Sequence, residues 1–565
     1  MNDLPGTLDQ LTARLQALEQ RVYVLEHPSA FSGEASATEV AIPAVTRSDD
    51  SPSLAQAGGL FPVFGKAMLG IAGAYLLRAV AESTSLPKLA VAAIAIVYAL
   101  LWLVWAARVK AATWVPSAIY AGTSALILAP MLWELTLSFK VLPPAATAAI
   151  LAAFVIAASA LAWKRDLAPV LWVAHVTAAA AALALAVATH QLLPFISVLL
   201  LMVLLCELAA EFHHELSLRP LVAAAADLGI WAIVFIYSGP QTARVEYPLL
   251  GAAALIVPPC VLFLIHASSV AVRTTALGQN ITVFETLQAI VAFLLAASGV
   301  LYFAPQFGAI SLGIVCLLLS IVCYALVFSV FHGFEAGRNP QVYAAWGTGL
   351  LLTGSLLCLS PLGIALCLGL AAIAATLLGV RQNRLTLQVH GLLLLLAMAI
   401  SSGLLGYGLQ ALAGTLPDHL AAGVPVAALC AVACYAGGIS APSETWKQQL
   451  LQLIPAAVSI CAAAALLVYG LLFLAAQRIA PEPYHIAFIR TLILCTVALS
   501  AAFAGSHWHR LELTRIAYAA LALVAVKLVL EDLRHGRLEF IAAAFFLFAL
   551  TLIAVPRLAR EGHKV

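Results

Sequence analysis

The residues of this sequence best placed to do chemistry are the few ionisable side chains that fall inside long apolar runs. His175 and Asp227 each lie well inside such a run. A titratable group at membrane depth is costly, so either residue could relay a proton or bind a substrate. The commoner explanation is structural, because a hydrogen bond from a neighbouring helix can satisfy the side chain.

Glu211 and His214 have the Glu-x-x-His spacing of carboxylate di-metal sites, and Glu207 lies one turn earlier on the same helical face. Such a site needs a second Glu-x-x-His and two further carboxylates, so one copy is weak support for it. A solvated helix end is the simpler interpretation. We therefore predict no bound metal and no other cofactor.

Two segments are candidates for a substrate path among the helices. Pro258 and Pro259 fall in the middle of an apolar run, where they remove two backbone donors and should kink the helix. Ser401 opens a Ser-Ser-Gly segment that is small and polar. Broken helices line substrate paths in many transporters, whereas a filled kink or a close-packing face is the structural alternative.

Near the C-terminus, Lys527 and Glu531 are i,i+4 partners at the end of an apolar run, and Asp532 follows. The pattern is typical of a boundary ion pair whose lysine extends toward the membrane surface. We expect it to fix the depth of the helix rather than to take part in a reaction.

The composition shows what must position these residues. Hydrophobic residues make up 63% of the chain and charged residues 10%, whereas roughly a quarter of the residues of soluble proteins are charged. In lipid the backbone must satisfy itself, and apolar runs of about 20 residues do so as helices. We predict an all-α polytopic membrane protein with the lipid bilayer as its partner. A net charge of +2 with scattered basic residues gives no indication of nucleic acid, and we expect no nucleic-acid partner.

About eighteen apolar runs predict as many transmembrane helices in a domain of residues 60–556, followed by a cytoplasmic tail of residues 557–565. The predicted spans are 61–80, 87–107, 116–133, 144–163, 168–189, 192–208, 221–237, 248–267, 284–303, 309–330, 343–358, 361–380, 389–411, 420–438, 452–476, 486–504, 514–530 and 539–555. With the N-terminus inside, the inner segments carry 18 Lys and Arg residues and the outer segments carry 8. This asymmetry predicts that both termini are cytoplasmic.

Residues 1–27 form the predicted coiled coil, because six apolar side chains follow a heptad pattern. They are Leu8, Leu11, Leu15, Leu18, Val22 and Leu25. In a parallel homo-oligomer Arg14 would face Glu19, and Arg21 would face Glu26. The stripe is under three heptads long, so an amphipathic helix lying on the protein or on lipid is the alternative. Residues 28–59, rich in Ser, Ala, Pro and Thr, predict a flexible linker.

Both ends of the chain carry recognisable motifs. A helix that starts at Arg515-Ile516 continues to Lys527, and Asp532-Leu533 and a final helix follow. The coiled coil, the linker and the first span Met68–Arg78 complete the pattern. The chain resembles a family of uncharacterised bacterial multi-pass membrane proteins, defined only as a domain of unknown function, although Arg537-Leu538-Glu539 stands where that family has a Tyr-Arg pair. The resemblance implies a bacterial inner membrane and no established activity.

Three functions are consistent with the sequence. The first is a non-enzymatic scaffold that self-associates through the coiled coil. The second is a transporter or lipid-handling protein, which predicts that His175, Asp227, Pro258-Pro259 and Ser401 converge on one cavity. The third is a membrane glycosyltransferase, suggested only by Glu82 in the first predicted outer loop.

Overall fold

The computed structural model describes residues 54–83, 88–108, 114–165, 167–212, 217–331, 337–413, 420–439, 446–476, 482–535 and 537–561. The predicted coiled coil and residues 28–53 of the predicted linker lie outside them. The chain divides into two units, Met1–Phe61 and Pro62–Val565. The packing and the sites described below all belong to the second unit.

Helices make up nearly all of the described residues, which include no strand. The helices are α2 (Leu54–Ser83), α3 (Lys88–Arg108), α4 (Trp114–Trp133), α5 (Pro144–Arg165), α6 (Ala168–Thr189), α7 (Leu192–Glu211), α8 (Arg219–Ser238), α9 (Ala252–Thr275), α10 (Val283–Phe303), α11 (Gly308–Ser329), α12 (Arg338–Cys358), α13 (Pro361–Arg381), α14 (Leu385–Ser401), α15 (Leu404–Ala413), α16 (Gly423–Gly438), α17 (Trp446–Ala476), α18 (Pro483–His507), α19 (Leu511–Lys527), α20 (Leu533–His535) and α21 (Leu538–Glu561). Short helical segments of other types are the π-helices η1 (Glu134–Ser138) and η3 (Leu528–Asp532) and the 3-10 helix η2 (Gln241–Arg244).

Every predicted span coincides with helix, which confirms the all-α polytopic class. Fourteen helices of the described part are long and apolar enough to cross a membrane, or fifteen if a bent pair counts as one span. That pair is α14 and α15, which meet at 61°, so the predicted continuous span 389–411 is broken. At the two ends of the domain, α2 begins inside the predicted linker, and α21 extends into the predicted tail.

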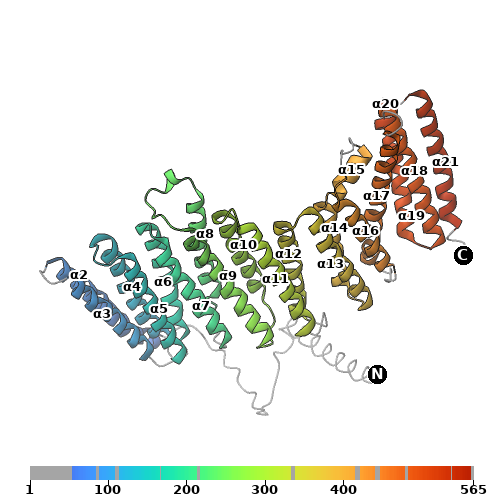
Figure 1. Ribbon diagram of the computed structural model, residues 1–565. Helices are drawn as coiled ribbons and strands as arrows, with labels where there is room; N and C mark the ends of the chain where they lie inside the picture. The colour runs from blue at the N-terminus through green and yellow to red at the C-terminus, as the bar shows by residue number, and fades with distance from the viewer. Residues whose placement is uncertain are drawn as a thin grey trace, which may run out of the picture. The chain divides into compact units, whose positions relative to one another are not determined.

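Helices adjacent in sequence pack as hairpins, as seen for α11 with α12, α13 with α14 and α18 with α19 (Figure 1). Longer-range pairs such as α7 with α9 and α18 with α21 join the hairpins. The largest buried apolar cluster is built from α3 to α10 and the second from α13 to α18. Alanines such as Ala99, Ala158 and Ala182 are fully buried in the first, and such small residues let helix backbones approach closely.

Close approach is most evident between α2 and α3. The Tyr98 hydroxyl donates a hydrogen bond to the Gly70 carbonyl oxygen at 3.1 Å. A Cβ atom on Gly70 would lie 2.4 Å from the Trp102 ring, and one on Gly73 would lie 2.7 Å from the Tyr98 hydroxyl oxygen. Only glycine therefore lets these aromatic side chains pack against the α2 backbone.

Two hairpins share one turn that we did not recognise in the sequence. Asn383, between α13 and α14, and His509, between α18 and α19, have positive φ angles of 51° and 53°. The next residue in each, Arg384 or Arg510, donates its backbone N–H at 2.8 Å to the carbonyl of a glycine five positions earlier. Identical spacing, Gly-x-x-x-x-Arg, and identical geometry indicate a repeated helical hairpin within the chain.

Candidate functional site

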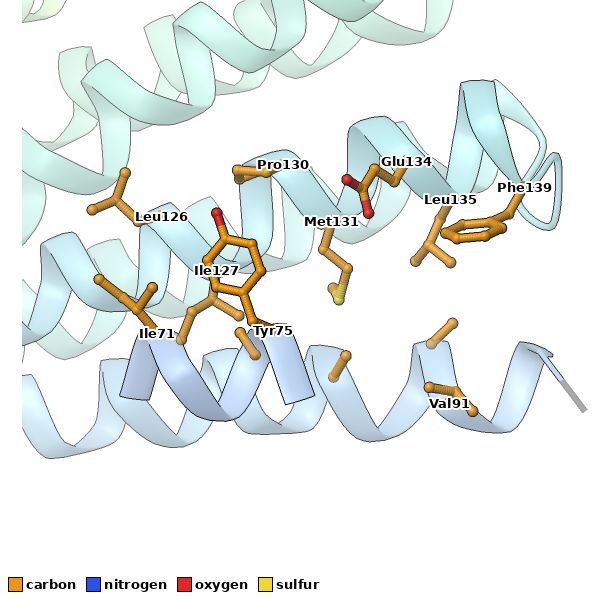
Figure 2. A pocket seen from close by; sticks show the side chains of 13 residues that line it. Ile71, Tyr75, Val91, Leu126, Ile127, Pro130, Met131, Glu134, Leu135 and Phe139 are labelled. Atoms are coloured by element: carbon orange, nitrogen blue, oxygen red, sulfur yellow. The ribbon is translucent and has the colours of Figure 1, made fainter. Parts of the chain in front are cut away.

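A cavity of about 280 Å³ lies between α2, α3, α4 and η1. We call it the α2–α4 cavity. Its walls are apolar, and among the described side chains that line it only Tyr75 and Glu134 carry an oxygen (Figure 2). Binding pockets for small molecules are typically apolar with a few placed polar groups and start at about 300 Å³. The α2–α4 cavity is therefore of a size and character that suit a small amphiphile or part of a lipid.

The carboxylate of this cavity is positioned by a change of helix type. Pro130 lies inside α4, and the helix continues as the π-helix η1, whose first residue is Glu134. η1 is tied to α5, because the Thr136 and Thr147 hydroxyls bond each other at 2.7 Å. π-Helical turns occur frequently at functional sites. This one presents Glu134 to the cavity beside Met131 and Leu135 (Figure 2).

The α2–α4 cavity is open on the side that faces away from the protein core. Tyr75 and Leu126 line it, and 64% and 62% of their surfaces are exposed. Both lie on helices whose neighbouring residues are apolar, so this opening faces lipid. A ligand dissolved in the bilayer could enter sideways.

A second polar feature, which we call the α7–α10 polar network, lies inside a different part of the domain. It consists of Glu207, Glu211, Arg219, Asp227, His266, Ser269, Arg273, Glu285 and Gln288. Its centre is Glu207, which is 3% exposed. Arg219 donates to Glu207 at 2.6 and 3.3 Å, and Ser269 donates at 2.8 Å.

Glu285 is the second carboxylate of the network and closes the N-terminus of α10. It forms a capping box with Thr282, in which each side chain accepts the backbone N–H of the other residue. It also pairs with Arg219 at 3.2 Å and with Arg273. Two buried carboxylates and two guanidinium groups thus neutralise each other at the ends of α7 to α10.

Asp227 belongs to the same network but lies deeper in the span. Gln288 Nε2 donates to both of its carboxylate oxygens, at 2.9 and 3.0 Å. The same nitrogen lies 3.3 Å from His266 Nε2, and His266 Nδ1 lies 3.5 Å from Glu207. The structure therefore connects Asp227 to the charged helix ends through Gln288 and His266.

Near the C-terminus of the chain a balanced group of charges surrounds Lys527. Its ammonium group bonds the Ala487 carbonyl at 2.8 Å, the Thr491 hydroxyl at 2.8 Å and Asp532 at 2.7 Å, and Glu531 lies at 3.2 Å. Arg490 bonds Glu531 at 2.7 Å. Lys527 is 7% exposed, so it does not extend into water as a snorkelling residue would. Two cations and two anions join α18, α19 and η3 in a structural cluster.

The remaining candidate residues do not converge with Asp227. His175 is buried and bonds the Leu171 carbonyl of its own helix at 3.0 Å. Ser401 bonds Ala397 of its own helix at 2.6 Å, beside the bend between α14 and α15. Pro258 and Pro259 lie in the continuous helix α9, and Pro259 packs against Gly299 of α10. None of these residues, nor Asp227, lines the α2–α4 cavity.

The Glu211 and His214 pair is only partly described. Glu211 ends α7, whereas His214 lies outside the described residues. The sequence also contains a second Glu-x-x-His, Glu482 and His485, so the expectation of a single copy is wrong. These two residues form a capping box at the N-terminus of α18, a local role that needs no metal. Among the described residues no group of three or more His, Cys, Asp and Glu is placed to hold a metal ion.

Several residues that the structure brings together were not recognised as a group from the sequence. Arg219 and Arg273 looked like ordinary loop charges, and His266 and Gln288 were not singled out, although both fall inside apolar runs. Glu134 also follows an apolar run directly. In each case the available signal was a polar residue within or beside a span.

Glu82, the basis of the glycosyltransferase hypothesis, lies in the last turn of α2 rather than in a loop.

Comparison of the chain with family models, with curated proteins and with solved structures found no match in any of the three.

Proposed function

We propose that this multi-pass membrane protein is a lipid-handling protein whose α2–α4 cavity binds a lipid with a primary ammonium headgroup. The observation that carries the proposal is an apolar cavity, open to lipid, with the carboxylate of Glu134 among its lining groups. The acyl part of the ligand suits the apolar walls, and the ammonium group suits the carboxylate and the Tyr75 hydroxyl. The proposal develops the transporter or lipid-handling hypothesis of the sequence analysis. It places the binding site at Glu134 instead of at Asp227.

Charge decides which headgroup fits best. The described side chains that line the cavity include one carboxylate and no cation. A lipid phosphate or carboxylate alone would therefore be repelled, whereas an ammonium group donates charge-assisted hydrogen bonds, worth about 1.5 to 3 kcal/mol each. Glu134 stands at the end of α4, where a lipid headgroup would lie. The excess of Lys and Arg on the inner segments supports placing this end on the outer face of a bacterial inner membrane with both termini cytoplasmic.

The test is native mass spectrometry of the purified, delipidated protein with three added phospholipids. Phosphatidylethanolamine has a primary ammonium, phosphatidylcholine has no N–H donor, and phosphatidylglycerol has no cation. We expect ethanolamine lipid to bind about 10- to 100-fold more tightly than glycerol lipid, from one charge-assisted bond. In Glu134→Gln this preference should disappear while binding of the glycerol lipid is retained.

A matched control is Glu246→Gln, which removes an exposed carboxylate in the loop before α9. It should leave the preference for ethanolamine lipid intact. Equal binding of ethanolamine and glycerol lipids by the unaltered protein would refute the proposal. So would a preference that survives in Glu134→Gln.

A second candidate function is a non-enzymatic membrane scaffold or assembly component. The heptad stripe of residues 8–25 supports it, together with the complementary pairs Arg14 with Glu19 and Arg21 with Glu26. Deleting residues 1–27 should reduce the mass of the detergent-solubilised particle measured by light scattering. An unchanged mass would count against this role. Membership of the uncharacterised bacterial family remains part of the same proposal and rests on the motifs at the two ends of the chain.

A further inference from the structure

We propose that Asp227, Gln288 and His266 form a proton-binding site, in which one exchangeable proton resides on Asp227 at neutral pH. The site is distinct from the α2–α4 cavity, and its ligand is the proton itself. The proposal goes beyond lipid binding, because a proton-binding site would make the charge of the α7–α10 polar network depend on pH.

The first reason is the number of charges. The described members of the network contain four carboxylates, Glu207, Glu211, Asp227 and Glu285, against two guanidinium groups and one imidazole, so the carboxylates outnumber the cationic groups whatever the charge of His266. Both guanidinium groups are already paired with Glu207 and Glu285. A buried group of charges in a membrane is stable only when each charge has a partner. A carboxylate in excess of the cations therefore needs a proton to become neutral.

The second reason is that Asp227 forms no ion pair with a Lys or Arg among the described residues. Its hydrogen bonds among the described residues both come from the neutral amide of Gln288. Glu207, by contrast, accepts from a guanidinium group and a hydroxyl. Asp227 also lies far inside its helix, eight residues after Arg219 in α8. The proton is accordingly assigned to Asp227.

The third reason is that His266 offers a route for exchange. Its Nδ1 atom faces Glu207 at 3.5 Å, and its Nε2 atom lies 3.3 Å from the amide nitrogen that bonds Asp227. An imidazole can take a proton on one nitrogen and release one from the other. A proton entering at the helix ends where Arg219 and Arg273 lie can thus reach His266. Because an amide NH2 does not relay protons at neutral pH, the last transfer, from His266 Nε2 to Asp227, requires the Gln288 amide to turn aside.

Other titratable side chains lie on the helices packed against α8, and any spectroscopic change must be separated from theirs. They are His175 on α6, Cys206, Glu207 and Glu211 on α7, Cys260, His266 and Arg273 on α9, and Glu285 and Tyr302 on α10, while α8 itself carries Arg219, Asp227 and Tyr237. Only Asp227 among these carboxylates lies within hydrogen-bonding distance of Gln288. Changing Asp227 and Gln288 separately therefore isolates it.

The test is infrared difference spectroscopy of the full-length protein in detergent micelles. Subtracting the spectrum of Asp227→Asn from that of the unaltered protein at pH 7 should leave the carbonyl band of a protonated carboxylic acid. The band should shift in D2O, because the proton exchanges, and should be lost as the pH is raised. A second variant, Gln288→Leu, keeps Asp227 but removes its hydrogen bonds, so the band should move to higher wavenumber.

The control is Glu246→Gln, because Glu246 also faces a histidine, His190 at 3.2 Å, but is 74% exposed. Its difference spectrum at pH 7 should contain only the bands of an ionised carboxylate. The proposal fails if the Asp227→Asn difference shows the same ionised bands, or if Gln288→Leu leaves the acid band unmoved. If Asp227→Asn does not fold, the position of the acid band in Gln288→Leu still tests whether Asp227 carries the proton.

Discussion

Replacing Lys527 with methionine should destabilise the protein strongly, although the two side chains have similar lengths. Lys527 is buried and gives its three N–H donors to Ala487, Thr491 and Asp532. Glu531 keeps Arg490 as a partner after the change, whereas Asp532 loses its cation and stays buried. Removing one partner of a buried ion pair costs about 3 to 5 kcal/mol. The unfolding equilibrium should therefore shift by at least about a hundredfold.

The measurement is reversible unfolding in mixed micelles titrated with sodium dodecyl sulfate. Lys140→Met, at an exposed loop position, is the control and should change the unfolding free energy by less than about 0.5 kcal/mol. The double variant Lys527→Met with Asp532→Asn should be more stable than Lys527→Met alone, because the unpaired charge is gone. If Lys527→Met unfolds like Lys140→Met, the cluster does not hold α18, α19 and η3 together.

Three further predictions concern packing and charge. Ala95→Phe, which places an aromatic ring in the α2–α4 cavity, should weaken phospholipid binding in native mass spectrometry while thermal stability stays unchanged or rises. Gly505→Ala should lower the free energy of unfolding by about 1 to 3 kcal/mol in the denaturant titration, because its Cβ would lie 2.9 Å from the Thr514 nitrogen. Gly406→Ala should leave the free energy of unfolding unchanged, because a Cβ there meets open space. Arg219→Met should destabilise by about 3 to 5 kcal/mol in the same denaturant titration, because Glu207 loses its bidentate partner; a loss below 1 kcal/mol would contradict this.

The spans could be predicted because hydropathy acts locally. A run of about 20 apolar residues has few alternatives to a membrane helix, so even short runs near 343–358 and 420–438 proved helical. The bend after Ser401 was missed, since hydropathy does not detect a change of direction. Gly403, with φ of 81°, marks the place, and a glycine after two serines was the available signal.

The polar sites could be predicted only in part, because their members come from different helices. Asp227 was identified from its depth, but its partners Gln288 and His266 are 61 and 39 residues away, and sequence spacing does not reveal which helices pack together. Lys527 and Glu531 were found because they are one turn apart. Arg490, which completes that cluster from α18, was not.

The most direct test of the lipid-handling account is an experimentally determined structure of the protein in nanodiscs that contain phosphatidylethanolamine. We predict density for an acyl chain in the α2–α4 cavity, with the headgroup nitrogen within hydrogen-bonding distance of the Glu134 carboxylate. A cavity closed by its own side chains, or a lipid whose phosphate rather than its nitrogen faces Glu134, would contradict the account.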